Sequence, residues 1–542
     1  MIKYKIKYST KKIIKILKFL KNILIPMIFF ISFLLYFSAN WIEKTYGNIE
    51  FNEILFHILV PIQGTEKKLF NSFLKNSIIP TIFTTTMLIF LNVNICKNIV
   101  KEKKYILNIE KFNFLNIFHI IERQKDFILS YEKILKIRII IKKKLILIVL
   151  ILIKILIFLF CIFKTIDILN LKEYFEKIKQ NSNFIEQNYI DPKKIKISFP
   201  KKKQNLILIF VESLESSFLS ENLGGIEKDN LLSPLTKPIK ENINFSDSEK
   251  FGGAFSVYGA NFTSAGIVAQ TLAIPLKVNI KTINNEYNHR KLLKKAYGLG
   301  DILKKEGYSQ LFMLGSDIKF GNKDSIIKNH GNCQIFDYFK AIEKGYIKKN
   351  YKQWWGIEDS KLFEIAKKEI ICLQKKAKPF ICSILTSNTH FPGGYVEKNY
   401  KRKFKDKYSD SIFSTCEEIA KFLKWAEKQT FYKNTTIVIT GDHLSMEKQH
   451  FLNLKNTNKR RIFNLFINSK TKPIKTKNRK FTSFDILPST IASLGAKIEG
   501  ERLGLGTNLF SNEKTLAEKY DINKINEELK KESLFYYLNF IV

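Results

Sequence analysis

The feature that most constrains this sequence is a set of three long apolar runs in its first third. They cover residues 22–38, 78–95 and 145–163, and each is long enough to cross a hydrocarbon core of about 30 Å as a helix. Lys154, in the third run, is the one awkward residue inside them. Three such runs are not expected as buried helices of a soluble protein. The sequence therefore predicts a membrane domain over residues 1–172 with about three transmembrane helices.

The charges that flank these runs predict how the chain is oriented. Residues 1–21 hold eight Lys and no acidic residue, whereas residues 39–77 balance four Lys against four Glu. Residues 96–144 hold thirteen Lys or Arg against five acidic residues. Because basic flanks stay in the cytoplasm, we expect the first and third of these segments inside and everything after about residue 164 outside. The stretch 131–144, with interleaved Ile and Lys, is predicted to lie on the inner membrane surface.

The formal net charge of +40 suggests a polyanionic partner, either nucleic acid or an anionic membrane. The excess is almost all Lys and is scattered along the chain. No nucleic-acid-binding motif or basic aromatic cluster accompanies it. We therefore expect an anionic membrane surface and no nucleic acid as partner.

Six cysteines are present, and the first two lie in the apolar third. The other four, Cys333, Cys372, Cys382 and Cys416, show no zinc-binding spacing, which is typical of buried small hydrophobic residues. One disulfide among these four is compatible with an oxidising compartment, and the sequence does not assign the pair.

The rest of the chain is predicted to form a linker, an α/β domain and a tail. Residues 173–203 are polar, rich in Lys and Asn and interrupted by two prolines, as expected of a linker. Over residues 204–511, short apolar runs alternate with amphipathic stretches, which predicts an α/β domain with a central, mostly parallel sheet. Residues 512–542 are polar, are predicted to be helical, and end in the apolar string LFYYLNFIV, which either packs on the domain or touches the membrane.

Polar residues directly follow the predicted strands of this domain. Strands are predicted at residues 206–211, 310–314, 380–385 and 436–440, and helices at 299–306 and 412–428. Glu212 follows the first strand, and Asp442 and His443 follow the last. Because ligands bind beyond the carboxyl ends of parallel strands, we expect these side chains to converge. Together they form a mixed oxygen and nitrogen ligand set for Mn²⁺, Mg²⁺ or Zn²⁺.

Two further polar segments lie between these strands. NFTSAG contains Thr263 and Ser264, and SNTHFPGG contains His390. A metal beside a Thr hydroxyl would stabilise its alkoxide, as a phosphoryl-transfer nucleophile requires. Each residue also has a purely structural interpretation: Glu212 and Asp442 as capping carboxylates, the Thr-Ser pair as a helix N-cap, and the His as a loop residue. Their joint placement at strand ends is what favours a site.

Five strings in order over about three hundred residues resemble the membrane-anchored phosphoglycerol transferases of the alkaline phosphatase/sulfatase superfamily. They are NLILIFVESLESSF, FTSAGIVAQTLAIPL, SNTHFPGG, NTTIVITGDHLSM and FDILPSTIASLG followed by RLGLG. They are more similar to the enzyme that decorates periplasmic glucans than to lipoteichoic acid synthase. The membrane part is similar mainly through EILFHILVPIQGT. The resemblance implies an alkaline phosphatase/sulfatase-like fold after the transmembrane helices.

The resemblance also implies roles for single residues. The implied metal ligands are Glu212, Thr263, Asp442 and His443, with Mn²⁺ as the expected metal and Mg²⁺ or Zn²⁺ as alternatives. Thr263 would be the nucleophile, and His390 would contact the substrate or assist proton transfer. Lys319 and Lys323, in the string SDIKFGNK, would bind the phosphate of the substrate. The string from Trp355 to Asp359 also resembles a family string, without an implied role.

The implied reaction has two steps. Thr263 would take phosphoglycerol from phosphatidylglycerol, and a glycan or glycolipid hydroxyl outside the cytoplasm would then take it from the phospho-threonine. The implied location is the bacterial cytoplasmic (inner) membrane, with the catalytic domain facing the periplasm or the cell exterior. Alternatives that stay open are a phosphoethanolamine transferase acting on lipid A or a surface glycan, lipoteichoic acid synthase, and an inactive membrane-anchored binding module. A sulfatase needs a Cys or Ser nucleophile, for which only Ser264 is at hand.

Overall fold

The computed structural model describes residues 20–47, 49–60, 63–91, 145, 148–278, 292–452 and 454–541. The chain divides into two compact units. The first comprises residues 1–45 and 67–171, and the second residues 46–66 and 172–542. The stretch predicted to lie on the inner membrane surface, residues 131–144, is outside the described residues, as are nearly all of the predicted cytoplasmic segments.

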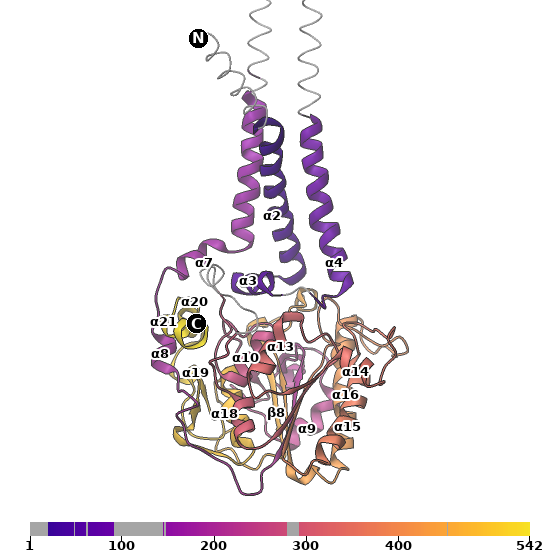
Figure 1. Ribbon diagram of the computed structural model, residues 1–542, viewed down its shortest axis with the longest axis vertical. Helices are drawn as coiled ribbons and strands as arrows, with labels where there is room; N and C mark the ends of the chain where they lie inside the picture. The colour runs from indigo at the N-terminus through magenta and orange to yellow at the C-terminus, as the bar shows by residue number, and fades with distance from the viewer. Residues whose placement is uncertain are drawn as a thin grey trace, which may run out of the picture. The chain divides into compact units, whose positions relative to one another are not determined.

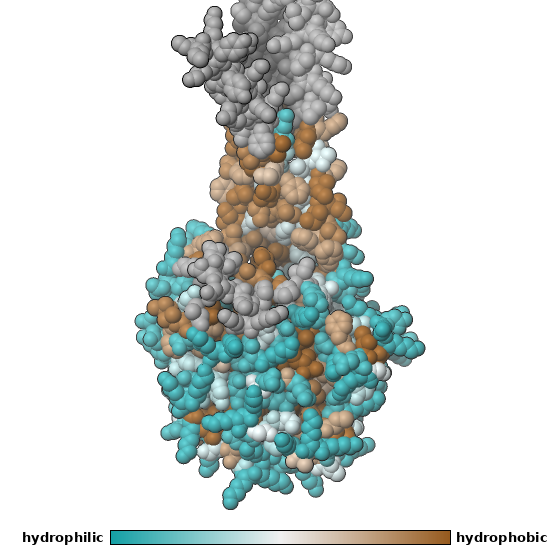
Figure 2. Space-filling view, in the orientation of Figure 1, coloured by the Kyte–Doolittle hydropathy of each residue, from teal (hydrophilic) through white to brown (hydrophobic). Residues whose placement is uncertain are grey.

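In its described part, the first unit consists of three helices that are long and apolar enough to cross a membrane. They are Asn22–Tyr46, which contains α2 (Ile25–Tyr46), Lys67–Leu91, which begins with α4 (Lys67–Phe73), and Ile148–Ile168. Phe29, Phe33 and Cys161 form a small core among them. The Trp41 indole N–H donates a hydrogen bond to the Ser72 hydroxyl (3.1 Å). Large apolar side chains cover the outer surface of these helices (Figure 2), as expected of lipid-facing segments, so the predicted number of candidate crossings agrees with the structure.

The second unit is built on a seven-stranded sheet with the order β3-β8-β7-β2-β6-β4-β5. Its strands are β2 (Asn205–Val211), β3 (Gly253–Ala254), β4 (Ser309–Leu314), β5 (Gln334–Phe336), β6 (Phe380–Leu385), β7 (Thr435–Gly441) and β8 (Ile462–Ile467). The strands from β7 to β5 are parallel, whereas β8 runs antiparallel to β7 and β3 antiparallel to β8. The prediction of a mostly parallel sheet is confirmed, and the four predicted strands are β2, β4, β6 and β7.

The sheet has a hydrophobic core on each face. Alternate residues of β2 enter different cores, because successive side chains of a strand point to opposite faces. This is why its run NLILIFV is apolar throughout. One core takes residues of α10 (Thr263–Leu272), α12 (Leu299–Lys305) and α18 (Ile486–Ser493), and the other takes residues of α15 (Asp359–Gln374) and α16 (Lys407–Glu427) (Figure 1).

Helix α16 begins five residues before the predicted start at residue 412. The reason is a side-chain cap, because the carboxylate of Asp406 accepts a hydrogen bond from the backbone N–H of Ser409 (2.9 Å). A cap of this kind holds a first turn that the hydrophobic pattern alone does not indicate.

The remaining elements are short. They are α3 (Phe51–Leu59), α7 (Leu171–Lys177), α8 (Phe184–Asn188), α9 (Thr236–Glu241), α13 (Lys323–Asn329), α14 (Tyr338–Glu343), α17 (Lys448–Phe451), α19 (Leu516–Lys519), α20 (Ile522–Lys530), α21 (Leu534–Tyr536), and the paired strands β1 (Ile197–Ser198) with β9 (Lys497–Ile498) and β10 (Arg502–Leu503) with β11 (Gly506–Thr507). Phe184 and Ile185 join the first core, and β1 pairs with β9, so the segment predicted as a linker contributes packing residues. The predicted domain boundaries themselves stay predictions.

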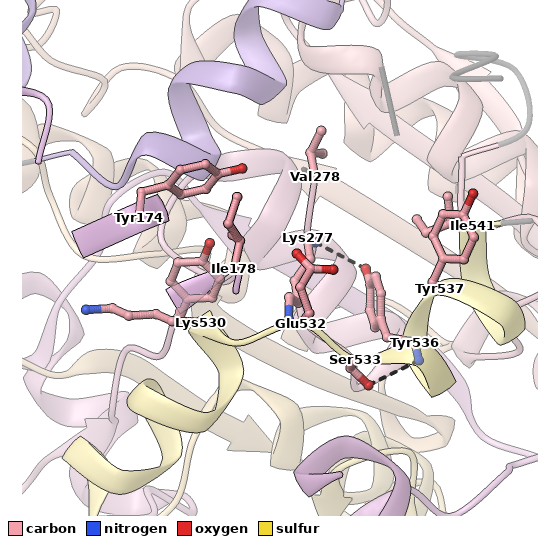
Figure 3. Close-up of a pocket in the computed structure, with 11 residues that line it drawn as sticks. Tyr174, Ile178, Lys277, Val278, Lys530, Glu532, Ser533, Tyr536, Tyr537 and Ile541 are labelled. Carbon is pink, nitrogen blue, oxygen red and sulfur yellow. Dashed lines mark hydrogen bonds between the residues drawn. The ribbon is translucent and has the colours of Figure 1, made fainter. Parts of the chain in front are cut away.

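The C-terminal tail packs on the second unit, which is one of the two outcomes predicted for it. Tyr536 and Phe540 are buried in the first core. The Tyr536 hydroxyl donates to the carbonyl oxygen of Pro275 (2.7 Å) and accepts from the backbone N–H of Lys277 (3.1 Å). A small pocket lies where the tail meets Lys277, with Glu532 among its lining residues (Figure 3).

The five cysteines that the structure describes are all free. Cys382 and Cys416 are buried in the second core and act there as small hydrophobic residues. Cys333 is partly exposed and Cys372 is exposed, and neither forms a disulfide.

Candidate active site

Glu212, Asp442 and His443 lie together at the carboxyl edge of the parallel strands. The register pairs Val211 of β2 with Gly441 of β7, so the residues that follow these two strands become neighbours. All three side chains are buried, and one ligand atom from each lies within 4.8 Å of the others. Nε2 of His443 is 3.2 Å from Oε1 of Glu212 and 3.6 Å from Oδ2 of Asp442. The strand ends thus bring together the three residues that the sequence analysis singled out.

The donor atoms of this cluster fit a divalent cation. Oδ1 of Asp442 accepts from the backbone N–H groups of Ser213 (2.7 Å) and His443 (2.9 Å). Its buried Oδ2 has no hydrogen-bond partner among the described residues. Nδ1 of His443 is 2.7 Å from the carbonyl oxygen of Leu444, and a proton on Nδ1 leaves the lone pair of Nε2 directed at the carboxylates. Two carboxylates and one imidazole suit Mn²⁺, Mg²⁺ or Zn²⁺.

Burial and the closeness of the charges shift the pKa values in the cluster. Burial, and then the charge of Glu212, raise the pKa of Asp442 to about 7. Burial alone would lower the pKa of His443, but the charges of the two carboxylates outweigh it and raise that pKa to about 10. Burial likewise opposes ionisation of Glu212, but the charges of His390 and His443 hold its pKa well below its usual range. Two buried carboxylates at this spacing need a nearby positive charge, which a divalent cation would supply.

Thr263 is the first residue of α10, and its hydroxyl points toward the cluster. Its Oγ1 donates to Oε2 of Glu212 (3.2 Å) and lies 3.4 Å from Nε2 of His443. The N-cap of the helix is Phe262, with no side-chain cap, so Thr263 does not serve as the cap. The neighbouring hydroxyl of Ser264 is buried and donates instead to the carbonyl oxygen of Gly321 (2.7 Å). Of these two neighbouring hydroxyls, that of Thr263 therefore contacts the cluster, at the first turn of the helix, whose N–H groups have no partner within the helix.

Helix α10 lies directly against the backbone that carries Asp442. A Cβ atom on Gly266 would be 2.1 Å from the carbonyl oxygen of Asp442, so only glycine allows this approach. Nε2 of Gln270 donates to the carbonyl oxygens of Gly441 (2.8 Å) and Asp442 (3.2 Å). These contacts fix the nucleophile candidate relative to the ligands. The sequence analysis did not single out Gln270, because nothing in its neighbours shows what its amide contacts.

Lys323 and Lys319 have different environments. Lys323 begins α13, and its side chain is only 4% exposed. Burial lowers the pKa of Lys323 to about 8, while the charges of Glu212 and Asp317 act to raise it. Its ammonium also donates to the carbonyl oxygen of Phe320 (2.6 Å). The Lys319 side chain is exposed, and within the described part of the chain no hydrogen bond or ion pair joins it to the cluster.

His390 lies in the loop after β6, and a buried carboxylate holds this loop in place. Asp359, which is fully buried, accepts from the backbone N–H of Ser387 (2.8 Å) and from the hydroxyl of Thr415 (3.0 Å). The ring of His390 packs on Trp355, with centroids 4.7 Å apart. Burial lowers the pKa of His390, and the nearby charge of Glu212 opposes this. Trp355 and Asp359 belong to the string that had no implied role, and they position the loop of His390.

An ion pair between Arg460 and the buried Glu215 supports the segment after Asp442. The carboxylate of Glu215, which is fully buried, accepts from Nε of Arg460 (2.9 Å) and from the backbone N–H of Ser445 (2.7 Å). Because Ser445 follows His443 by two residues, the pair fixes the course of the chain that carries the ligands. The sequence analysis missed this pair because its two members lie far apart in the chain.

Replacing Arg460 with methionine is expected to destabilise the second unit by about 3–5 kcal/mol, because the carboxylate of Glu215 is left buried and unpaired. Urea unfolding of the detergent-solubilised chain, followed by tryptophan fluorescence, measures the loss. Lys361→Met is the control, since the Lys361–Glu364 pair is exposed and is worth at most about 1 kcal/mol. Equal losses of unfolding free energy in both variants would show that the Arg460–Glu215 pair stabilises the fold no more than the exposed pair does.

Comparisons with known proteins agree with this geometry. The family model described as Sulfatase matches residues 204–496. Phosphoglycerol transferase I of Escherichia fergusonii is 30% identical over 356 residues, which are 62% of this chain and 44% of that protein. The protein of the same name from Salmonella typhi is 29% identical over the same number of residues and the same shares. This chain therefore spans less than half the length of the curated relatives it matches.

Among solved structures, the chain is similar to the lipoteichoic acid synthase LtaP from Listeria monocytogenes, with a TM-score of 0.46 and 15% identity over 60% of this chain and 80% of that one. It is also similar to the lipooligosaccharide phosphoethanolamine transferase EptA from Neisseria meningitidis, with a TM-score of 0.47 and 12% identity over 88% of this chain and 85% of that one. The family model covers more than half of this chain, and the matched residues include Glu212, Thr263, Asp442 and His443. The protein belongs to the sulfatase family, within the alkaline phosphatase superfamily.

Proposed function

We propose that this protein is a metal-dependent phosphotransferase that moves phosphoglycerol from phosphatidylglycerol to a glycan or glycolipid hydroxyl outside the cytoplasm. The observation that carries the proposal is the position of the Thr263 hydroxyl, 3.2 Å from Oε2 of Glu212 and 3.4 Å from Nε2 of His443. A hydroxyl so placed lies beside groups that accept its proton and hold a cation. The name of the relatives that are about 30% identical supports phosphoglycerol as the transferred group.

The chain's own residues divide the work of the first step. The Thr263 oxygen attacks phosphorus and gives up its proton toward the carboxylate of Glu212. A divalent cation held by Glu212, Asp442 and His443 would polarise a phosphoryl oxygen and favour the alkoxide. The ammonium of Lys323 neutralises charge that develops on the phosphoryl oxygens. The bond from phosphorus to the diacylglycerol oxygen breaks, and we assign to His390 the transfer of the proton that Thr263 released to that oxygen.

The second step releases the enzyme. The acceptor hydroxyl attacks the phosphorus of phospho-Thr263, the bond from phosphorus to the Thr oxygen breaks, and the Thr hydroxyl regains a proton. The same groups act in reverse order, as microscopic reversibility requires. Because the loop of His390 is fixed by Asp359, the acid–base group keeps its place through both steps.

We also assign the second unit to the outer side of the bacterial cytoplasmic membrane. The basic flank at residues 1–21 and three candidate crossings support this orientation. Tethering the site to the membrane raises the effective concentration of a lipid donor. The Lys-rich surface favours anionic lipids such as phosphatidylglycerol.

The test is the intact mass of the full chain in detergent after incubation with phosphatidylglycerol and Mn²⁺. We expect a glycerophosphate adduct on the wild-type protein and none on Thr263→Ala. An adduct with phosphatidylethanolamine in place of phosphatidylglycerol would move the assignment to a phosphoethanolamine transferase. No adduct with either lipid, although Mn²⁺ binds, would contradict the proposed reaction.

A further inference from the structure

We propose that the segment between the first two candidate transmembrane helices completes the donor site, and that His57 in this segment binds the phosphodiester of the donor headgroup. The inference rests on the proposed function for the identity of the donor, but not on the transfer step. It adds a ligand contact from outside the region that the sulfatase model matches, residues 204–496.

The segment belongs structurally to the catalytic unit, although it is far from that unit in sequence. Its helix α3 (Phe51–Leu59) is attached at two points. Phe56 is fully buried, and its ring centroid is 5.1 Å from that of Phe262, the residue before Thr263. Nδ2 of Asn52 donates to the carbonyl oxygen of Leu276 (3.1 Å). Helix α3 is thereby fixed to the residue before α10 and to the segment that follows α10.

His57 follows Phe56, and its ring contacts Phe262, which precedes Thr263, and Phe320, which lies three residues before Lys323. Its ring centroid is 5.5 Å from that of Phe262 and 6.3 Å from that of Phe320, nearly parallel to the latter at 28°. The carbonyl oxygen of Phe320 accepts the hydrogen bond from Lys323. Yet the His57 side chain as a whole is exposed, so packing does not seal its nitrogens. An imidazole held beside two aromatic rings in an exposed residue can present an N–H group to a ligand.

The charges around His57 favour an anion as its ligand. Desolvation by the surrounding protein, and then the charges of Lys323 and His390, lower the pKa of His57 to about 4, so its imidazole is neutral at pH 7 and keeps one N–H donor. An anion beside this N–H group would gain a hydrogen bond from the ring and the nearby positive charge of the Lys323 ammonium. A phosphodiester has two non-bridging oxygens and one negative charge, and it is the anion that the proposed reaction brings to Thr263.

The two ends of the segment pack against the loops that carry His390 and Lys323. The ring of Tyr46 is 4.9 Å from that of Phe391, which follows His390. Near the other end, a Cβ atom on Gly64 would be 3.1 Å from side-chain carbons of Asp317 and Phe320. Both ends of the segment therefore pack against residues that flank His390 and Lys323. Because the segment joins two candidate membrane helices in the chain, we assign a lipid headgroup as its ligand.

The test is a binding titration by calorimetry, with the full detergent-solubilised chain carrying Thr263→Ala so that no donor is consumed, in the presence of Mn²⁺. The ligands are dihexanoylphosphatidylglycerol and, separately, inorganic phosphate. In this background His57→Phe keeps a ring for packing but has no N–H group, His57→Gln keeps a donor without the ring, and Ile58→Ala is the control on a residue that is 70% exposed.

We expect His57→Phe to weaken binding of the lipid about tenfold, because a hydrogen bond to a charged group is lost. His57→Gln should lose less, and Ile58→Ala nothing. If His57→Phe weakens the binding of both ligands, His57 contacts the phosphate group itself. If it weakens the binding of the lipid alone, His57 recognises the diester headgroup. Lipid binding that is unchanged in His57→Phe, an effect on inorganic phosphate alone, or no lipid binding by the Thr263→Ala parent would each overturn the inference. If binding depends on His57 but the wild-type protein forms no adduct, the inference stands and the proposed function falls.

Discussion

Replacing Thr263 with alanine is expected to lower turnover of phosphatidylglycerol by at least ~10⁴-fold while folding stays intact. The variant loses the oxygen that attacks phosphorus, and losing the nucleophile of a covalent mechanism typically costs on the order of 10⁴ to 10⁶ in kcat. Its fold should survive, because the side chain is partly exposed and is not the N-cap of α10. We expect the free energy of unfolding to change by less than about 1 kcal/mol. Release of diacylglycerol from phosphatidylglycerol vesicles measures the turnover.

Two neighbouring variants make this result specific. Thr263→Ser keeps a hydroxyl 3.2 Å from Glu212 and should retain turnover well above that of the alanine variant. Ser264→Ala removes a hydroxyl that donates to Gly321 and should leave turnover within about tenfold of the wild type. Loss of turnover in Ser264→Ala but not in Thr263→Ala would indicate a sulfatase-like nucleophile. Unchanged turnover in both variants would exclude both hydroxyls as the nucleophile, and no turnover by the wild type would favour a binding module.

The fold and the ligand cluster could be predicted because their signals are local. An apolar run such as NLILIFV predicts a strand by itself, and the polar residue that follows it marks the carboxyl edge of the sheet. Glu212, Asp442 and His443 are all such residues. Their convergence follows from one parallel pairing, that of β2 with β7.

The supporting contacts could not be predicted because their partners are remote in sequence. Arg460 pairs with Glu215, and Asp359 holds the loop that begins at Ser387. In neither case does a periodic sequence pattern link the two partners. Local backbone conformation also matters. In SDIKFGNK, Gly321 and Asn322 both have positive φ, and this turn separates the exposed Lys319 from the buried Lys323. Two lysines in one short string are equivalent in the sequence until this turn is known.

The segment between the first two membrane helices shows the same limit at a larger scale. The sequence predicts EILFHIL as part of the membrane half of the chain, since its apolar residues precede the second crossing. Its pattern indicates a short helix with an apolar side, but not the surface on which this side packs. The surface is Phe262, beside Thr263, and this contact is what makes His57 a candidate ligand. The sequence string that matched least specifically in the family resemblance therefore adds a residue to the site.

Mn²⁺ is expected to stabilise the wild-type chain, and Glu212→Gln is expected to abolish that gain. A cation that binds only the folded state adds about 2.7 kcal/mol to the free energy of unfolding when its concentration is 100 times its Kd. Replacing the Glu212 carboxylate with an amide removes a charged ligand atom that lies 3.2 Å from Nε2 of His443. Because removing even an outer-shell partner of a metal ligand costs about 10–100-fold in affinity, loss of this ligand should cost at least ~100-fold.

Melting curves of the detergent-solubilised chain, with EDTA and with Mn²⁺, measure the stabilisation, and parallel titrations with Mg²⁺ and Zn²⁺ rank the metals. Glu221→Gln is the matched control, since Glu221 is exposed in the same stretch of chain and should leave the Mn²⁺ effect unchanged. The readout needs no substrate, so it tests the ligand set independently of the reaction. A rise in Tm with Mn²⁺ that persists in Glu212→Gln would place the cation elsewhere. No rise in Tm of the wild type with any of the three metals would contradict the metal site. Glu212, Asp442 and His443 would then form a buried charge cluster that holds no cation.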